Sequence, residues 1–328
     1  MTDKTMYAQY CLYCLKNKVR RRCNIIMSKF TKDDEFFKRR SYLGQKFMGP
    51  DEVNKKIAGF ISAQEPFMVA RYGGTEMNML LAHFNREIFH RQADEEQYKK
   101  SVQLLCKLSG FFPDDERLAE KFVKYMLDIS GMVDLLGVWG WYWEDFLCEQ
   151  YTKNAEFAVL RNLEPYYAEE TEPWSLALEG KKVLVIHPFS ESIQRQYERR
   201  QEIWGDRLIL PEFELQTIKA VQTLADQDDN RFCNWFEALA YMVGECRKRD
   251  FDIALIGCGA YGMPLAAEIK KMGKGAVHLG GALQILFGIK GNRWDDHPVI
   301  SRFYNDAWIR PVEQMPKGGE KVEGACYW

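Results

Sequence analysis

Short apolar runs alternate along the chain with longer stretches in which apolar residues recur at helical spacing. The clearest strand pattern is the β-branched run KKVLVIHPF at 181–189, which ends in polar and turn residues. Other apolar runs that predict strands lie at 66–71, 207–211, 251–257 and 275–280. Helical patterns fill the intervals, at 51–64, 72–84, 95–109, 115–129, 190–204, 231–249, 258–272 and 281–288. This alternation predicts an α/β fold with a doubly wound, mainly parallel sheet.

The domain organisation follows from what the sequence lacks after residue 50. It shows no repeat, low-complexity tract or linker there, so residues 51–328 are predicted to form one Rossmann-like α/β domain with helical insertions. Hydrophobic residues make up 46% and charged residues 28% of the chain, which is typical of a globular protein. Residues 1–50 are predicted to form a basic, helical N-terminal extension.

The net charge of −2 gives no reason to expect nucleic acid as a partner. Residues 1–40, however, hold eleven basic and four acidic residues, a net charge of +7, so the rest of the chain carries −9. The segment YAQYCLYCLKNKVRRRCNIIMSKF, residues 7–30, fits two structures. It could form an amphipathic helix on an anionic membrane surface, or a helix that packs on the main domain with a solvated basic face.

Cysteine usage and hydropathy bear on location. The nine cysteines are odd in number and scattered, and Cys11 and Cys14 lack the second pair that a zinc site needs. No apolar run reaches the roughly 18 residues of a membrane span, and no signal-peptide pattern is visible. The sequence therefore predicts a cytoplasmic protein, with residues 1–40 as the segment that could contact the inner face of a membrane.

Four predicted strands end in residues that can bind ligands. These ends are Arg71–Glu76, His187–Ser190, Gly257–Gly262 and His278–Gly281. The carboxyl ends of parallel strands meet at one edge of the sheet, where helix N-termini favour anions. We therefore expect the four segments to converge on one ligand, with Arg71, His187 and Tyr261 on the same side of the molecule.

Gly257, Gly259 and Gly262 have the G-x-G-x-x-G spacing of a dinucleotide-binding turn, between a strand and a helix. An NAD site also needs an acidic residue at the end of the next strand, where this chain has His278. Three interpretations stay open at this point. The loop could cradle the phosphates of another ligand, serve an NAD(P)-dependent oxidoreductase, or merely allow a strand and a helix to pack.

The polar residues at the other strand ends also allow a structural or a functional role. His187 could bind the ligand or hydrogen-bond to the backbone, and Ser190 could cap the following helix and leave its N–H groups for a phosphate. Arg71 ends a buried strand, so it needs a carboxylate or a phosphate as its partner. It either pairs with Glu76, or Glu76 faces the ligand as a metal ligand, a base or an acceptor for sugar hydroxyls.

Aromatic residues are concentrated in DLLGVWGWYWEDFL, residues 134–147. We expect most of Trp139, Trp141, Tyr142 and Trp143 to pack in the core, and one or two of these rings to line a cleft.

The segment VARYGGTEM resembles the Arg-x-Gly-Asp-Gly-Glu signature of the GT-D-type glycosyltransferases. The segments VLVIHPFSESIQRQY and DIALIGCGAYGMPLAAEIKKMGKGAVHLGGALQILFGIKGNRW resemble the C-terminal half of that family and its bacterial relatives, so the resemblance covers roughly residues 55–310. It implies a Rossmann-like fold and transfer of a hexosyl group from a nucleotide sugar, with a UDP-sugar favoured. It also implies a glycan or lipid-linked glycan acceptor, in bacterial cell-surface polysaccharide or glycoconjugate synthesis.

The resemblance also implies site residues. The family's Asp-x-Glu motif, associated with the metal and the diphosphate, falls on Gly74-Thr75-Glu76, where the glutamate is kept and the aspartate is absent. Glu76 is the expected ligand of a divalent Mn²⁺ or Mg²⁺ ion and the first candidate base. Asp295 and Asp296 are the second candidates, and Trp294 could stack on a sugar. The residues expected to hold the nucleotide sugar are Arg71, Gly73, Gly74, Thr75, His187, Ser190, Gly257, Gly259, Ala260, Tyr261, Gly262, Gly280, Gly281 and Gln284. A subunit that binds nucleotide without catalysing transfer remains an alternative.

Overall fold

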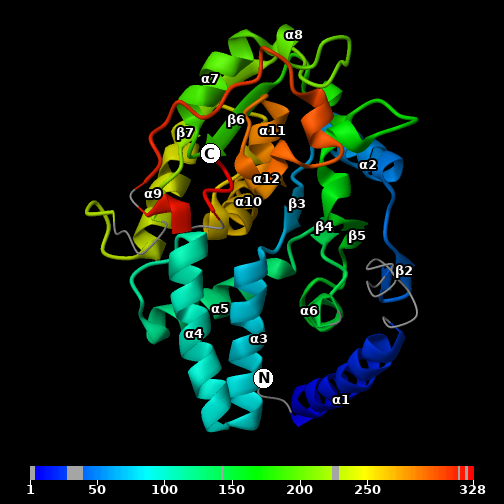
Figure 1. Ribbon diagram of the computed structural model, residues 1–328, viewed down its shortest axis with the longest axis vertical. Coiled ribbons are helices and arrows are strands. Elements are labelled where there is room, and N and C mark those ends of the chain that lie inside the picture. Colours follow the sequence, from blue (N-terminus) through cyan, green and yellow to red (C-terminus); the bar gives the residue numbers. More distant parts are fainter. Residues whose placement is uncertain (1–3, 28–39, 142, 224–228, 317, 322–323) are drawn as a thin grey trace.

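The fold is built on a seven-stranded sheet in which all neighbouring strands are parallel (Figure 1). In this computed structural model, residues 4–27, 40–141, 143–223, 229–316, 318–321 and 324–328 are described. The strands are β3 (Met68–Arg71), β4 (Leu135–Val138), β5 (Glu156–Val159), β6 (Lys182–His187), β7 (Glu214–Lys219), β8 (Ile253–Ile256) and β9 (Gly275–His278). They lie in the order β5-β4-β3-β9-β8-β6-β7. The predicted α/β class with a parallel, doubly wound sheet is confirmed.

Strand residues point alternately to the two faces of the sheet, and each face packs against its own layer of helices. In β6, Val183 and Val185 face one layer, whereas Leu184 and Ile186 face the other. The first layer contains α2 (Pro50–Ala63), α7 (Ser190–Glu198), α8 (Arg200–Ile203), α11 (Leu283–Leu286) and α12 (Asn292–Asp295). The second contains α3 (Gly74–Phe89), α4 (Gln92–Ser109), α5 (Glu116–Ser130), α6 (Glu144–Tyr151), α9 (Trp235–Arg247) and α10 (Gly262–Lys271). Apolar side chains on both faces explain why the central strands read as continuous hydrophobic runs.

The predicted strand at 207–211 is wrong, because those residues form no strand and Leu208 is 74% exposed. The strand of this region is β7, seven residues further on, whose sequence ELQTIK is mostly polar. β7 lies at the edge of the sheet and most of its residues are partly exposed, so it lacks the apolar run of a central strand. β4 and β5 were not predicted either, and β4 lies inside the aromatic segment.

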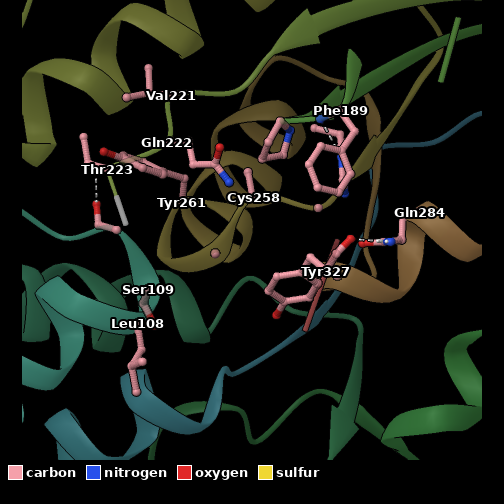
Figure 2. Close-up of a pocket in the computed structure, with 16 residues that line it drawn as sticks. Leu108, Ser109, Phe189, Val221, Gln222, Thr223, Cys258, Tyr261, Gln284 and Tyr327 are labelled. Carbon is pink, nitrogen blue, oxygen red and sulfur yellow. Dashed lines mark hydrogen bonds between the residues drawn. The ribbon is translucent and has the colours of Figure 1, made fainter. Parts of the chain in front are cut away.

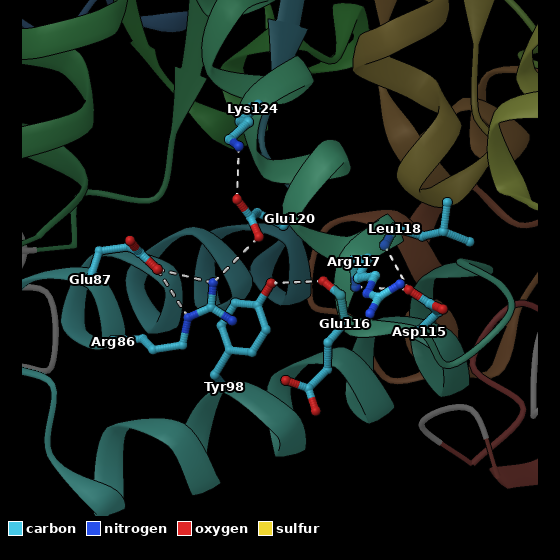
Figure 3. A network of polar contacts seen from close by, with 9 residues as sticks. All are labelled: Arg86, Glu87, Tyr98, Asp115, Glu116, Arg117, Leu118, Glu120 and Lys124. Carbon is cyan, nitrogen blue, oxygen red and sulfur yellow. Dashed lines mark hydrogen bonds and ion pairs between the residues drawn. The ribbon is translucent and has the colours of Figure 1, made fainter. Parts of the chain in front are cut away.

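The helices α3, α4 and α5 form an insertion between β3 and β4, and α3 and α4 run along each other away from the sheet (Figure 1). A polar network joins the three helices (Figure 3). The guanidinium of Arg86 lies 3.7 Å from the ring centre of Tyr98 and forms ion pairs with Glu87 at 3.0 Å and Glu120 at 3.9 Å. Asp115 caps α5 by accepting hydrogen bonds from two backbone N–H groups of its first turn. The predicted helical insertion is therefore present and held rigidly.

The N-terminal helix α1 (Lys4–Met27) packs against the far end of α3 and against α6. The ring of Tyr10 lies 5.6 Å from that of Phe84 and 5.0 Å from that of Phe146, and its hydroxyl donates to Asn85 Oδ1 at 2.7 Å. The hairpin of β1 (Ser41–Tyr42) and β2 (Gln45–Lys46) places Tyr42, fully buried, in the same apolar cluster. None of the helices in the described parts of the chain has both the length and the apolarity that crossing a bilayer requires.

Candidate functional site

A cavity opens at the carboxyl edge of the sheet, between the ends of β6 and β8 (Figure 2). β6 connects onward to β7 on one side and β8 to β9 on the other, and the helices that follow them, α7 and α10, lie on opposite faces. Neighbouring strands with diverging connections leave a crevice in which α/β proteins bind ligands. The cavity has about 550 Å³ of empty space when its open mouth and the adjoining solvent are included.

The structure brings the predicted segments together at this cavity. The predicted residues that line it are His187, Gly257, Gly259, Tyr261, Gly281 and Gln284. Those that lie outside the lining are Gly73, Gly74, Thr75, Ser190, Ala260, Gly262 and Gly280. Arg71 also lies outside the lining, next to Gly280, where an added Cβ atom would lie 3.4 Å from Arg71 Nη1. Arg71, His187 and Tyr261 therefore lie at one edge of the sheet, as the parallel strand order predicts.

The three glycines of the loop after β8 are each required by close packing. A Cβ atom on Gly257 would lie 2.7 Å from Cδ2 of His187, and one on Gly262 would lie 2.0 Å from Cε1 of His278. Gly259 has a φ of +56°, and a Cβ there would lie 2.7 Å from a backbone carbonyl oxygen at the end of α4. The loop needs glycine for its own packing, so its spacing is no specific evidence for a dinucleotide. The next strand, β9, also ends without an acidic residue.

His187 and His278 are both buried and neutral. Nδ1 of His187 accepts a hydrogen bond from the N–H of Phe189 at 3.0 Å, and burial lowers the pKa of His187 to about 3. Its proton therefore lies on Nε2, which makes the ring a neutral donor at the cavity wall. Burial lowers the pKa of His278 to about 3 as well, and its Nδ1 lies 3.2 Å from the carbonyl oxygen of Ile256. His278 has the packing role that the sequence left open.

Two buried polar side chains of the cavity lining lack a complete set of hydrogen bonds. Nε2 of Gln284 donates to three backbone carbonyls at 3.0–3.3 Å, which fixes the orientation of the amide. Its Oε1 is buried and accepts no hydrogen bond from any described residue. Tyr261 stacks on Trp235 at 5.0 Å, and its hydroxyl lies beside Thr223 without a hydrogen bond of normal geometry. A buried acceptor without a donor costs about 1–3 kcal/mol.

Arg71 is a partly exposed cation at the end of the central strand β3. Its guanidinium lies 5.1 Å from the ring centre of Trp139, and within the described part of the chain no residue forms a hydrogen bond or ion pair with it. Burial lowers the pKa of Arg71, an effect that Tyr327, Glu76 and Glu164 partly offset. The salt bridge between Arg71 and Glu76 that the sequence allowed is not formed. The forked donors of a free guanidinium match the oxygens of a phosphate.

Glu76 is buried behind the wall of the cavity. Thr75 Oγ1 donates to its Oε2 at 3.0 Å, and the same hydroxyl is hydrogen-bonded to Ser109, which lines the cavity. A Cβ atom on Gly73 would lie 1.9 Å from Glu76 Oε2, so the carboxylate folds back over the start of its own helix. Burial raises the pKa of Glu76. Glycine at position 73 thus follows from the position of this carboxylate.

The protein offers too few oxygen ligands around Glu76 to hold a divalent metal ion without help from the substrate. A hard divalent ion takes about six oxygen ligands or more, and Glu76 offers one hydrogen-bonded carboxylate. In the described residues no group of three or more His, Cys, Asp or Glu side chains is arranged to hold an ion. A Mn²⁺ or Mg²⁺ ion would depend on substrate phosphates and water, and the metal stays a prediction.

A second carboxyl group, that of Glu164, lies on the other side of Arg71. Glu164 follows β5, remains partly exposed and accepts a hydrogen bond from the hydroxyl of Tyr166. Burial raises the pKa of Glu164 to about 7, against the opposing effects of Tyr166 and Arg71. A carboxyl group with such a pKa can take a proton from a hydroxyl, so Glu164 is a further candidate base, although it does not line the cavity.

The aromatic segment forms a loop that a buried carboxylate holds in place. Glu144 is fully buried and accepts hydrogen bonds from the successive N–H groups of residues 139–141 at 2.9–3.3 Å, and from the hydroxyl of Tyr42 at 2.9 Å. The rings of Trp139 and Trp141 stack at 5.1 Å and both remain partly exposed beside Arg71. Neither ring is among the residues that line the cavity, so the expectation that one or two of these rings line a cleft stays a prediction. Tyr142 lies outside the described residues.

Three predicted roles are corrected by the contacts. Ser190 does not cap α7, because the carboxylate of Glu313 accepts hydrogen bonds from the second and third N–H groups of that helix at 2.9 and 3.0 Å. The N-terminus of α7 therefore already holds an anion, and a phosphate has no place there. Asp295 forms an ion pair with Arg310 and does not line the cavity. Trp294 is buried in the core, which leaves no face for a sugar.

Sequence reasoning missed residues that the C-terminal segment brings to the site. The ring of Tyr327 lies against Gly281, where an added Cβ would be 2.2 Å from Tyr327 Cε1, and it lines the cavity. The guanidinium of Arg293 lies 4.9 Å from the centre of the Tyr327 ring and acts electrostatically on Arg71. Neither residue lies at a strand end or in a periodic segment, so no sequence signal singles them out.

Comparisons with known proteins do not identify the activity of this protein. No protein-family model matches the chain, and no curated protein matches it. A solved structure described as a highly conserved domain of unknown function, 1792, with a distinct glycosyltransferase fold is similar over 81% of this chain and 96% of that chain. The identity is 12% and the TM-score is 0.33, so the likeness supports no conclusion about the activity of this protein.

Proposed function

We propose that the protein is a glycosyltransferase that moves a hexosyl group from a nucleoside-diphosphate sugar, with UDP-sugars favoured, to a hydroxyl of a glycan or lipid-linked glycan. The observation that carries the proposal is the cavity between β6 and β8, whose lining includes Gln284 with its unsatisfied Oε1, together with the unpaired guanidinium of Arg71 beside Gly280 at the same edge of the sheet. A nucleoside diphosphate supplies both missing partners, because it has hydroxyl or N–H donors at one end and phosphates at the other. The choice of a sugar as the transferred group rests on the resemblance of VARYGGTEM to the GT-D-type family.

In this proposal the nucleoside lies in the cavity and its phosphates extend past Gly280 to Arg71. Arg71 neutralises the charge that develops on the leaving diphosphate, with Arg293 as the nearby second cation. The exposed faces of Trp139 and Trp141 stack on a sugar ring at the same edge. Glu164 accepts the proton of the attacking hydroxyl. The biological setting, bacterial cell-surface polysaccharide or glycoconjugate synthesis, belongs to the same proposal.

The experiment is a thermal-shift panel of UDP-, GDP-, dTDP- and CMP-sugars, each with and without Mn²⁺, with NADH as the comparison ligand. A ligand present at 100 times its Kd adds about 2.7 kcal/mol to the free energy of unfolding. We expect UDP-sugars to raise the melting temperature and NADH to leave it unchanged. A shift with NADH and with none of the nucleotide sugars would refute the proposal.

A second assay separates catalysis from binding. Release of free UDP from a UDP-sugar, with a glycan acceptor mixture present, is expected of a transferase. Binding of the UDP-sugar without any release of UDP, across acceptors, would instead identify the non-catalytic subunit named above as an alternative.

A further inference from the structure

The outer face of α1 carries apolar residues that the fold leaves exposed. Tyr7, Leu12, Leu15 and Val19 are 49%, 52%, 60% and 56% exposed, and they make up four of the ten exposed large hydrophobic residues of the described chain. Leu12, Leu15 and Val19 have the i, i+3, i+7 spacing that places them on one face of the helix. The side of α1 that packs on the protein is a different one, centred on Tyr10. We call the exposed face of Leu12, Leu15 and Val19 the α1 stripe.

The charge of α1 is entirely positive. The helix has 24 residues, among them six basic residues and no acidic residue. Lys16, Lys18 and Arg22 are exposed, and no ion pair joins them to any residue in the described part of the chain. At 100° per residue, Lys16 lies on one side of the α1 stripe and Lys18 and Arg22 on the other. An apolar stripe with basic flanks is the pattern of a helix that lies in the interface of an anionic bilayer.

We infer that the α1 stripe docks on an anionic lipid surface, with Leu12, Leu15 and Val19 inserted between headgroups and the flanking cations on lipid phosphates. A second copy of the chain is a poorer occupant, because two stripes face to face would bring Lys16, Lys18 and Arg22 of one copy close to the same cations of the other. Nucleic acid is also a poorer occupant, because phosphates would contact the cations and leave the apolar residues in water. The inference does not depend on the proposed function.

α1 lies beyond the carboxyl edge of the sheet, at the far end of the helical insertion. α3 begins at the carboxyl end of β3, and α1 packs on the opposite end of α3 and on α6, the helix that follows the tryptophan loop (Figure 1). α3 has 16 residues, which corresponds to roughly 24 Å along its axis. Roughly the length of α3 therefore separates α1 from the carboxyl end of β3.

The test is co-sedimentation of the full chain with vesicles of phosphatidylcholine alone or with about 30% phosphatidylglycerol. We expect binding to the anionic vesicles only, weakened by high salt, and lowered at least roughly tenfold in the triple variant Leu12→Gln, Leu15→Gln, Val19→Gln. A matched control changes exposed residues outside α1, Leu208→Gln with Val312→Gln, and is expected to bind vesicles like the wild type. Circular dichroism confirms that both variants remain folded.

Three outcomes would overturn the inference. The first is that the triple variant binds anionic vesicles as well as the control variant does. The second is that the wild type binds neutral and anionic vesicles equally. The third is that the wild type binds no vesicles and forms a dimer, whereas the triple variant is a monomer. Because the triple variant leaves the cavity unchanged, its affinity for UDP is expected to equal that of the wild type, so failure here is distinguishable from failure of the proposed function.

Discussion

Because the guanidinium of Arg71 is unpaired, replacing this residue is expected to affect the stability of the protein and its affinity for nucleotide differently. Replacing Arg71 with Met keeps the length of the side chain and removes the charge. Loss of the contact with Trp139 costs about 0.5–1 kcal/mol. Removing the charge also removes the free-energy cost of desolvating a cation that has no partner, and this gain offsets the loss. We therefore expect the free energy of unfolding, without ligand, to stay within about 1 kcal/mol of the wild type or to rise.

The same change is expected to weaken nucleotide binding strongly. A hydrogen bond between a guanidinium and a phosphate contributes about 1.5–3 kcal/mol, which corresponds to a roughly 10- to 150-fold rise in the Kd for UDP. The affinity for uridine, which lacks phosphates, is expected to remain as in the wild type. Isothermal titration measures both affinities, and denaturant unfolding measures stability.

Arg86→Met is the matched control, because Arg86 is a paired arginine far from the cavity. Its guanidinium contacts Tyr98, Glu87 and Glu120, so its loss is expected to lower the free energy of unfolding by about 1–2 kcal/mol and to leave UDP affinity unchanged. The reasoning is refuted if Arg71→Met unfolds more easily by 2 kcal/mol or more and binds UDP like the wild type. Arg71 would then be a structural residue.

Three further predictions concern packing, capping and proton transfer. Gly262→Ala is expected to destabilise the protein by about 1–3 kcal/mol, because the added methyl group overlaps a buried imidazole. Gly59→Ala, where the methyl group would lie in open space on α2, is expected to stabilise the protein by about 0.5–1 kcal/mol. Denaturant unfolding of both variants measures these changes in the free energy of unfolding. Glu313→Ala is expected to cost about 1 kcal/mol by uncapping α7, and Ser190→Ala almost nothing; equal effects in the same assay would contradict the assignment of the cap. The kcat/KM for sugar transfer is expected to fall as the pH drops through about 7, where Glu164 becomes protonated. Glu164→Gln is expected to abolish this pH dependence together with most of the activity. An unchanged pH profile in the variant would exclude Glu164 as the base.

The central part of the fold could be predicted from the sequence because its strands are buried on both faces. β8 and the four central residues of β6 are apolar, and parallel pairing then places the carboxyl ends of both strands at one edge. The convergence of Arg71, His187 and Tyr261 follows from that single topological fact. The strand β7 was not predicted, because an edge strand is partly exposed to water and therefore lacks the continuous apolar run by which the central strands were found.

The parts of the site that could not be predicted depend on contacts between distant segments. Glu313 reaches the start of α7 from 121 residues further along the chain, and the ring of Tyr327 lies on Gly281 from the C-terminal segment. Glu164 lies in an irregular segment after a strand of four residues. Such contacts leave no periodic pattern, since a loop residue is selected by its partner in space and not by its neighbours in sequence.

The most direct measurement is a crystal structure of the protein with UDP bound. The account predicts the nucleoside in the cavity between β6 and β8, with a ribose hydroxyl or base N–H donating to Gln284 Oε1 and phosphate oxygens within hydrogen-bond distance of Arg71. Ordered UDP at another place on the molecule, or in the cavity with its phosphates directed away from Arg71, would contradict it.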